Sequence, residues 1–170
     1  MLLVTLIALI GCKSNQKGES PVVAQRSNSA RVANPWMILE ENIGKYINDT
    51  LFFANASVDS TLHTALGKDF QKMKDEWNVP SPLNRAKNVI YITNCKTEKC
   101  SQGMWIVMIN IARNVANVYH FEPKKITFYQ STQKLVLPPQ IESYITNIKR
   151  NLRLSNLPED IITADDANKN

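Results

Sequence analysis

The sequence predicts an α+β domain, in which two N-terminal helices and one C-terminal helix pack on an antiparallel β-meander. Apolar residues recur at helical spacing in the first part of the chain and again near its end, and runs typical of strands lie between them. Short connections join the predicted strands and require antiparallel pairing, because a parallel pair needs a long crossover. Helices that flank such strands are expected to pack on their sheet.

Two helices are predicted before the sheet. The first covers 36–53, with Asn34 as its N-cap and Pro35 at its first position. The second opens near Asp59 and stops before Pro80. The apolar stripe of the second helix consists of Leu62, Ala65, Leu66, Phe70, Met73 and Trp77. A stripe at this spacing is expected to be a core face.

The strands and the last helix follow. Strands are predicted over 89–93, 104–111, 115–121, 126–129 and, as a last short one, 135–137. The second of them is a near-continuous apolar run, as expected of a central strand covered on both faces. Pro138 and Pro139 open the final helix, whose apolar face carries Ile141, Tyr144, Ile145, Ile148 and Leu152. Residues 158–170 are predicted to form a disordered acidic tail.

Length and composition limit the organisation. The chain has 170 residues, 44% of them hydrophobic, which suits one folded domain and excludes a wholly disordered chain. No apolar run reaches the roughly 18 residues that a membrane-spanning helix needs. The predicted division is a signal peptide over 1–11, a flexible tether over 12–34, a single α+β domain over 35–157 and the tail over 158–170.

The first residues predict export. Residues 1–11 are apolar and end on a small residue, after which the sequence turns polar, as in a secretory signal. Leu9-Ile10-Gly11-Cys12 resembles the lipobox of bacterial lipoproteins, in which a peptidase cuts before the cysteine and the thiol carries a diacylglycerol. Cys12 is therefore the predicted lipidation site, and Lys13 after it favours the outer membrane, facing the periplasm. The alternative is a mobile apolar N-terminus.

The 3 cysteines then have a simple assignment. With Cys12 acylated, Cys95 and Cys100 are left as a pair, and in an oxidising compartment they are expected to form a disulfide. The rival interpretation is a two-thiolate metal site. Zinc needs four ligands, and neither a second cysteine pair nor a His-x-x-x-His motif completes such a site. No metal and no cofactor is therefore predicted.

The net charge of +5 is unevenly distributed along the chain. Residues 85–153 carry eleven basic and three acidic side chains, whereas residues 12–84 carry eight of each. A basic surface favours an anionic partner, such as an acidic protein cleft, anionic lipid or a polyanionic glycan. Nucleic acid is not expected, because no basic–aromatic binding module is present. The alternative is that the lysines solvate strand edges and prevent aggregation.

A polar loop lies between the first two predicted strands, and Cys95 and Cys100 would close it into a small ring. Closure removes loop entropy before binding, so a protruding loop enters a cleft at lower cost. The residues inside the ring form the predicted target-binding loop: Lys96, Thr97, Glu98 and Lys99.

This loop resembles that of the Ivy family, the inhibitor of vertebrate lysozyme. Cys95, Lys96 and Cys100 match the family's Cys-Lys-Pro-His-Asp-Cys loop in identity and spacing. Met104-Trp105-Ile106-Val107-Met108 resembles the apolar strand that follows it, and the whole resemblance covers roughly residues 60–130. It implies a small exported bacterial protein with a sheet, flanking helices and a loop that plugs the lysozyme active site.

Two loop positions depart from the family pattern. Glu98 stands where the family has a histidine that hydrogen-bonds the catalytic carboxylates, and Lys99 stands where it has aspartate. Those carboxylates would repel a glutamate, so Lys96 or Lys99 is expected to pair with a catalytic glutamate instead. The basic half of the chain also favours a less basic bacterial hydrolase, such as a lytic transglycosylase, over a strongly cationic animal lysozyme.

The other titratable residues predict no catalytic site. His63 is expected to face solvent, and His120 to be packed or half-buried in its strand. The adjacent pairs Glu40-Glu41 and Asp75-Glu76 do not face one another on a helix and are expected to be solvated. The serines lack a Gly-x-Ser-x-Gly setting. The protein is therefore predicted not to be an enzyme.

The leading hypothesis is a lipid-anchored envelope protein that binds a peptidoglycan-cleaving enzyme, lysozyme or lytic transglycosylase, through the loop 96–99. Inhibition of that enzyme is the consequence to be tested. The alternative is a non-inhibitory envelope lipoprotein, either a scaffold or assembly component or a toxin-immunity protein, in which the disulfide is only structural. The predicted partners are thus a hydrolase or another envelope protein and, through the anchor, the membrane. A homodimer is left open.

Overall fold

The computed structural model describes residues 34–131, 133, 135–167 and 169. Residues 1–33 lie outside the described residues, and with them Cys12, the predicted signal peptide and most of the predicted tether. Within the described ranges, no helix combines the length and the apolar character that crossing a membrane requires.

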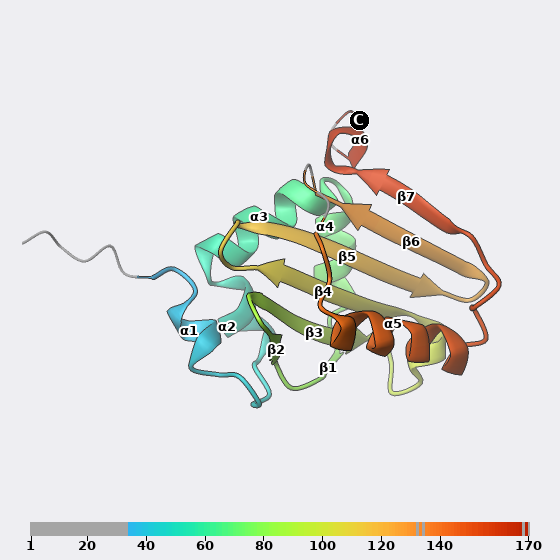
Figure 1. The fold of residues 1–170 in the computed structure, drawn as a ribbon, viewed down its shortest axis with the longest axis horizontal. Coiled ribbons are helices and arrows are strands. Elements are labelled where there is room, and N and C mark those ends of the chain that lie inside the picture. The colour runs from blue at the N-terminus through green and yellow to red at the C-terminus, as the bar shows by residue number, and fades with distance from the viewer. Residues whose placement is uncertain (1–33, 132, 134, 168, 170) are drawn as a thin grey trace, which may run out of the picture. The chain divides into compact units, whose positions relative to one another are not determined.

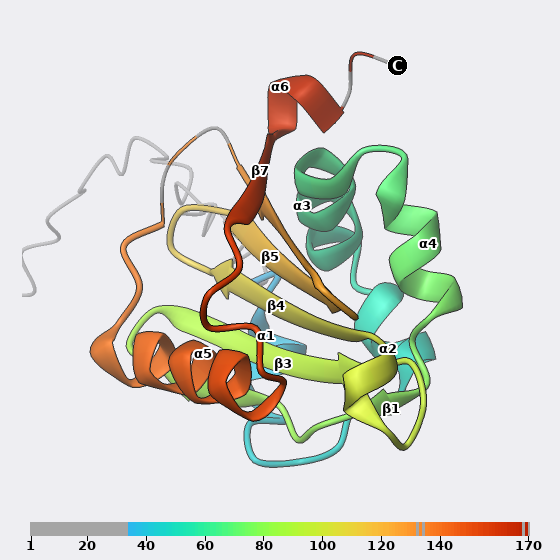
Figure 2. The ribbon, with the colours of Figure 1, turned by 90° about the vertical axis from the view of Figure 1, so that its right-hand side faces the viewer.

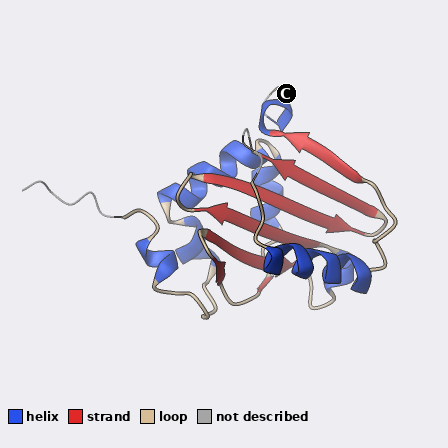
Figure 3. Ribbon diagram, viewed as in Figure 1, coloured by secondary structure: helices blue, strands red, loops and turns tan. Residues whose placement is uncertain are grey.

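The centre of the domain is a sheet in which nearly all neighbours run antiparallel (Figures 1 and 3). Its strands are β1 (Val79–Pro80), β2 (Asn84–Ala86), β3 (Val89–Cys95), β4 (Met104–Asn110), β5 (Val115–Glu122), β6 (Lys125–Gln130) and β7 (Glu159–Thr163). In space the order is β1-β3-β4-β5-β6-β7, and β2 also pairs with β3. Strands β3 to β6 form the predicted antiparallel meander.

Helices cover both faces of this sheet. They are α1 (Met37–Glu40), α2 (Asp49–Phe53), α3 (Ala56–Leu66), α4 (Asp69–Asp75), α5 (Pro139–Asn151) and α6 (Ala164–Ala167), and η1 (Cys100–Gln102) is a short 3-10 turn. In Figure 2, α3 and α4 lie on one side of the sheet and α5 lies on the other. The predicted α+β class, with helices from both ends of the chain packed on a meander, is confirmed.

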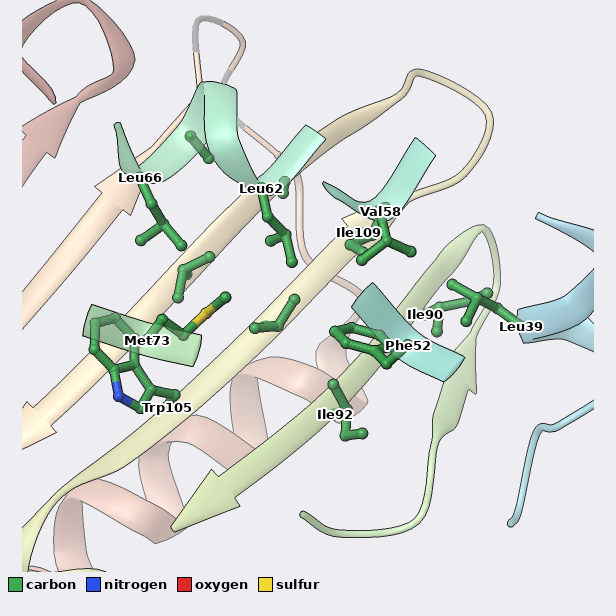
Figure 4. Packing of buried hydrophobic residues seen from close by; sticks show 14 of the residues in the cluster. Leu39, Phe52, Val58, Leu62, Leu66, Met73, Ile90, Ile92, Trp105 and Ile109 are labelled. Atoms are coloured by element: carbon green, nitrogen blue, oxygen red, sulfur yellow. The ribbon is translucent and has the colours of Figure 1, made fainter. Parts of the chain in front are cut away.

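Two hydrophobic cores result, one on each face. In β4, Trp105 and Val107 point to the helices from the N-terminal part of the chain, and Ile106 and Met108 point to α5. Successive side chains of a strand alternate between the two faces, so a strand covered on both sides is apolar throughout. Figure 4 shows the first core, in which Leu62 of α3 lies over the sheet. Each fully buried aliphatic side chain of this kind stabilises the fold by about 1.5–3 kcal/mol.

The first predicted helix, over 36–53, is interrupted in the structure. Between α1 and α2 the chain turns at Gly44, whose φ of +81° favours glycine. The amide of Gly44 donates to the carbonyl oxygen of Leu83 at 2.7 Å, and Tyr46 forms an isolated bridge with Pro82. Tertiary hydrogen bonds thus replace the helical ones in a segment that has helical spacing in the sequence.

The second predicted helix is also divided in two, and Gly67 marks the break. It follows α3 with a φ of +52°, and a Cβ at this position would lie 2.2 Å from the carbonyl oxygen of Ala167 in α6. Asn55 caps α3, since its side chain accepts from the amides of Ser57 and Val58, so the helix begins earlier than predicted. The predicted core stripe is nevertheless buried.

The prediction of a disordered acidic tail over 158–170 is wrong for residues 159–167. Strand β7 pairs in parallel with β6, from Ile126 opposite Glu159 to Gln130 opposite Thr163, and α6 follows it. Helix α5 supplies the crossover that parallel pairing needs. The two acids of β7 are paired with lysines, because Lys125 binds Asp160 at 3.4 Å and Lys149 binds Glu159.

The short strand predicted over 135–137 is not formed. These residues belong to the connection from β6 to α5, and Leu135 is buried in the second core. Leu135 and Leu137 therefore pack in the second core, Val136 is exposed to solvent, and β7, from a later part of the chain, takes the place beside β6.

Candidate functional site

The β3–β4 connection is a hairpin loop closed by a disulfide. Cys95 pairs with Met104 across the two strands, and the amide of Lys96 donates to the carbonyl oxygen of Gly103 at 2.9 Å. A disulfide joins Cys95 to Cys100, with 4.8 Å between their Cα atoms, as the cysteine count predicted. The ladder and the disulfide together fix both ends of the loop.

Within the loop, Thr97 organises the backbone. Its hydroxyl oxygen accepts from the amide of Lys99 at 3.2 Å and lies 3.1 Å from the carbonyl oxygen of Lys99, to which the hydroxyl donates. The amide of Gln102, in η1, donates to the same carbonyl at 3.0 Å. Lys96, Glu98 and Lys99 are exposed, so the loop presents charged side chains to solvent from a backbone held by hydrogen bonds.

Lys96 is bound to the body of the domain by Glu76, the residue that follows α4. Its Nζ lies 2.9 Å from Oε1 of Glu76, and the side chain of Asn78 donates to its carbonyl oxygen at 3.2 Å. The Glu76 side chain is only 12% exposed, whereas that of Lys96 is 50% exposed. The loop therefore has a non-local support besides the disulfide.

Glu76 is also the centre of a partly buried polar group, the Glu76 cluster, which consists of Glu76, Lys96, Trp105 and His120. The indole Nε1 of Trp105 donates to Oε2 of Glu76 at 2.9 Å. His120 Nε2 lies 3.5 Å from the same oxygen, and its ring stacks on Trp105 with 3.7 Å between the ring centroids. Strands β4 and β5 thus place a tryptophan and a histidine behind the carboxylate that holds the loop.

The charges in this cluster follow from its surroundings. Burial opposes ionisation of Glu76, but hydrogen bonds from Lys96 and Trp105 and the charges of His120 and Lys96 outweigh it, so its pKa lies below the ordinary value. The hydrogen bond to Glu76 raises the pKa of Lys96. Burial lowers the pKa of His120 to about 4, against the opposing charge of Glu122. At neutral pH the cluster therefore holds an ion pair beside an uncharged imidazole.

The structure brings the predicted loop residues together and adds Glu76, which the sequence prediction had placed in solvent with Asp75. Asp75 does face outward, where it accepts from the side chain of Gln71 at 2.7 Å. The missed signal was Trp105, because an indole buried in a central strand needs an acceptor. His120 is 1% exposed, which confirms the packed role, and His63 is exposed, with its ring against Phe70.

The described residues offer the loop no metal chemistry. No group of three or more His, Cys, Asp or Glu side chains in the described part of the chain could hold a metal ion. Glu76 has its oxygens occupied by Lys96 and Trp105. The arrangement is suited to presenting a preorganised charged loop, and preorganisation lowers the entropy lost on binding.

The described residues thus form a sheet covered on both faces, with a disulfide-clamped charged loop at one end. A family model described as inhibitor of vertebrate lysozyme (Ivy) matches residues 57–151, more than half of the chain. The chain belongs to this family, which is a family of inhibitors and not of enzymes. No curated protein and no solved structure matches the chain. The matched region runs from α3 to the end of α5 and includes Glu76 and the loop.

Proposed function

We propose that this protein is a lipid-anchored envelope protein that binds a peptidoglycan-cleaving enzyme and inhibits it through the loop 96–99. The observation that carries the proposal is the loop itself, which is clamped by Cys95–Cys100, supported by Glu76 and exposed at its charged positions. A loop with these properties can enter an active-site cleft with little further loss of entropy.

Lys99 is the residue that we expect to meet the catalytic carboxylate of the target. Lys96 already has Glu76 as a partner, whereas Lys99 is exposed and its ammonium group has no partner among the described residues. An ammonium group and a catalytic glutamate would form a charge-assisted hydrogen bond in the cleft. The catalytic carboxylate of the target would repel Glu98 at short range. We therefore expect the loop to enter the cleft with Lys99, and not Glu98, nearest to that carboxylate.

The target that fits these charges is a bacterial hydrolase, such as a lytic transglycosylase, and not a strongly cationic animal lysozyme. Opposite potentials favour encounter and like charges suppress it. The basic excess of residues 85–153 supports this choice, although β7 brings two acids, Glu159 and Asp160, onto the basic half.

The lipid anchor is proposed at Cys12, with the outer membrane as the site of attachment and the domain facing the periplasm. Metabolic labelling with a fatty acid, in wild-type cells and in a Cys12→Ser variant, tests this part separately. Label in the wild-type protein alone is expected, and equal labelling of both proteins, or of neither, would refute the anchor.

The binding function is tested by titrating the purified chain into a lytic transglycosylase and into an animal lysozyme, with turnover and calorimetry as the measurements. Stoichiometric inhibition of the transglycosylase is expected, and absence of both heat and inhibition with either enzyme would refute the function. The variant Cys95→Ser/Cys100→Ser is expected to bind about 10-fold or more weakly, because the ring then loses about 2 kcal/mol of preorganisation. A single cooperative thermal transition, at a lower temperature than that of the wild type, serves as the control for folding.

A further inference from the structure

A cleft lies beside the disulfide loop, at the end of the sheet that faces the viewer in Figure 2. Three connections meet at this end: the β3–β4 loop, the β5–β6 turn and the chain from α5 to β7. The cleft has a volume of about 330 Å³, and its lining includes Ser101, Phe121, Lys124, Leu152, Arg153 and Leu157. Ser101 follows Cys100 directly, so the cleft is continuous with the clamped loop.

Two cations of this cleft have no partner in the described part of the chain. Lys124 and Arg153 are exposed, and their side chains make no hydrogen bond or ion pair with any described residue. Their neighbours differ, because Lys125 binds Asp160 at 3.4 Å and Lys149 binds Glu159. The acids of β7 thus neutralise the adjacent lysines and leave this pair of cations available.

Apart from Ser101 and the two cations, the residues that line the cleft are apolar except for one acid. Phe121 is buried, and Leu152 and Leu157 are partly buried against the second core. Glu122 also lines the cleft, and its carboxylate is engaged by Lys72 at 3.2 Å. The cleft therefore combines apolar walls with a net positive charge, which fits an acidic side chain carried on an apolar segment of protein.

The backbone at both cations favours glycine. Lys124 has a φ of +66° and Arg153 a φ of +60°, values in the left-handed region that side chains with a Cβ rarely adopt. A change to glycine at either position removes the charge and suits the backbone. Weaker binding of such a variant could therefore not be attributed to a loss of stability. Lys87, exposed in the β2–β3 turn at the opposite end of the sheet, has a φ of +54° and is a matched control.

We infer that the Lys124–Arg153 cleft is a second contact site for the target enzyme, which receives an acidic side chain from the rim of the enzyme's active-site cleft. This inference rests on the proposed function. The loop 96–99 and the cleft would then form one continuous binding surface, in which the loop enters the active site and the two cations select targets with an acidic rim.

The test compares Lys124→Gly/Arg153→Gly with Lys87→Gly in the full chain, by calorimetry against the lytic transglycosylase at low and moderate salt. The double variant is expected to bind about tenfold more weakly and to show a weaker salt dependence, while Lys87→Gly stays within about twofold of wild type. Thermal denaturation is expected to give both variants transitions at or above the wild-type temperature.

The outcomes separate the two claims. If the wild-type chain binds and the double variant binds with unchanged affinity and salt dependence, the cleft is not a contact site and the proposed function stands. An equal loss in Lys87→Gly would also overturn the inference, because the effect would then come from net charge alone. If the wild-type chain binds no hydrolase, the proposed function fails and the inference fails with it.

Discussion

The two ends of the sheet carry hairpin connections that are held in different ways. At one end, the β3–β4 loop is clamped by Cys95–Cys100 and supported from behind by Glu76 through Lys96. At the other end, the β4–β5 turn contains Asn114, with a φ of +53°, whose side-chain oxygen accepts from the Trp36 indole at 2.9 Å. The first connection exposes charged side chains from a backbone that is held in place, and the second binds the N-terminal segment to the sheet. The loop thus has the fixed backbone and exposed charges that the proposed binding function requires, whereas the turn serves the fold.

The largest effect is expected from Glu76→Ala, which breaks the support of the loop. The change leaves the Trp105 indole without its acceptor in a buried position and releases Lys96, so we expect a loss of about 3 kcal/mol in the free energy of unfolding. Weaker binding of the target should accompany it, because the loop loses its non-local support. Chemical denaturation and calorimetry are the measurements.

The neighbouring carboxylate provides the control. Asp75 is exposed and, within the described part of the chain, its side chain binds only that of Gln71, so Asp75→Ala should change stability by less than about 0.5 kcal/mol. Glu76→Gln, which keeps an acceptor for Trp105 but not the ion pair, should lie between the two. Equal stabilities of the two alanine variants would contradict the assigned role of Glu76.

Local patterns predicted most of the fold, and the failures lie where distant residues decide the structure. The strands of the meander and α5 could be predicted from periodicity. Each meander strand pairs with the next strand in the sequence, and the apolar face of α5 is visible in the spacing of its own residues. Strand β7 was missed, since its acids become acceptable only beside Lys125 and Lys149. The break at Gly67 depends on the close approach of Ala167, a contact that helical spacing does not encode.

The candidate site shows the same division. The disulfide and the exposed charges at Lys96, Glu98 and Lys99 followed from cysteine spacing and polarity alone. The support by Glu76 did not, because the cluster takes its members from the end of α4 and from β4, β5 and the loop. Glu76 stands next to the solvated Asp75 in the sequence, and nothing in the sequence indicates that the Glu76 side chain turns toward the sheet.

A second, smaller effect concerns pH. The pKa of His120 is lowered to about 4 by burial, below its ordinary value of 6.5, so the folded chain keeps the imidazole neutral where the unfolded chain protonates it. The unfolded state then binds more protons between those values, and the free energy of unfolding falls as the pH drops through that window. Between pH 7 and pH 5 we expect a loss of about 2 kcal/mol.

The variant His120→Gln should flatten this dependence. Denaturation curves at several pH values between 5 and 7 measure it, and in this window Glu76, whose pKa is lowered, stays ionised, so its titration does not interfere. Both proteins should lose stability together at more acid pH, where Glu76, with its lowered pKa, becomes protonated. A wild-type curve that is as flat as that of the variant would show that His120 is protonated in the fold as readily as in the unfolded chain.

The smallest effect is expected at the opposite end of the sheet, from Asn114→Gly. Glycine suits the φ of +53° at this position, so the change removes the side-chain oxygen without adding backbone strain. The Trp36 indole, in a residue that is 3% exposed, then loses its acceptor, and we expect a loss of about 1 kcal/mol in the free energy of unfolding. Calorimetry with the target enzyme should give the wild-type affinity, because the turn lies away from the loop that we propose to bind the target. If Asn114→Gly weakens target binding as much as Glu76→Ala does, both effects on binding come from the lower stability of the fold. The proposed distinction between a loop held for a partner and a turn held for the fold would then be wrong.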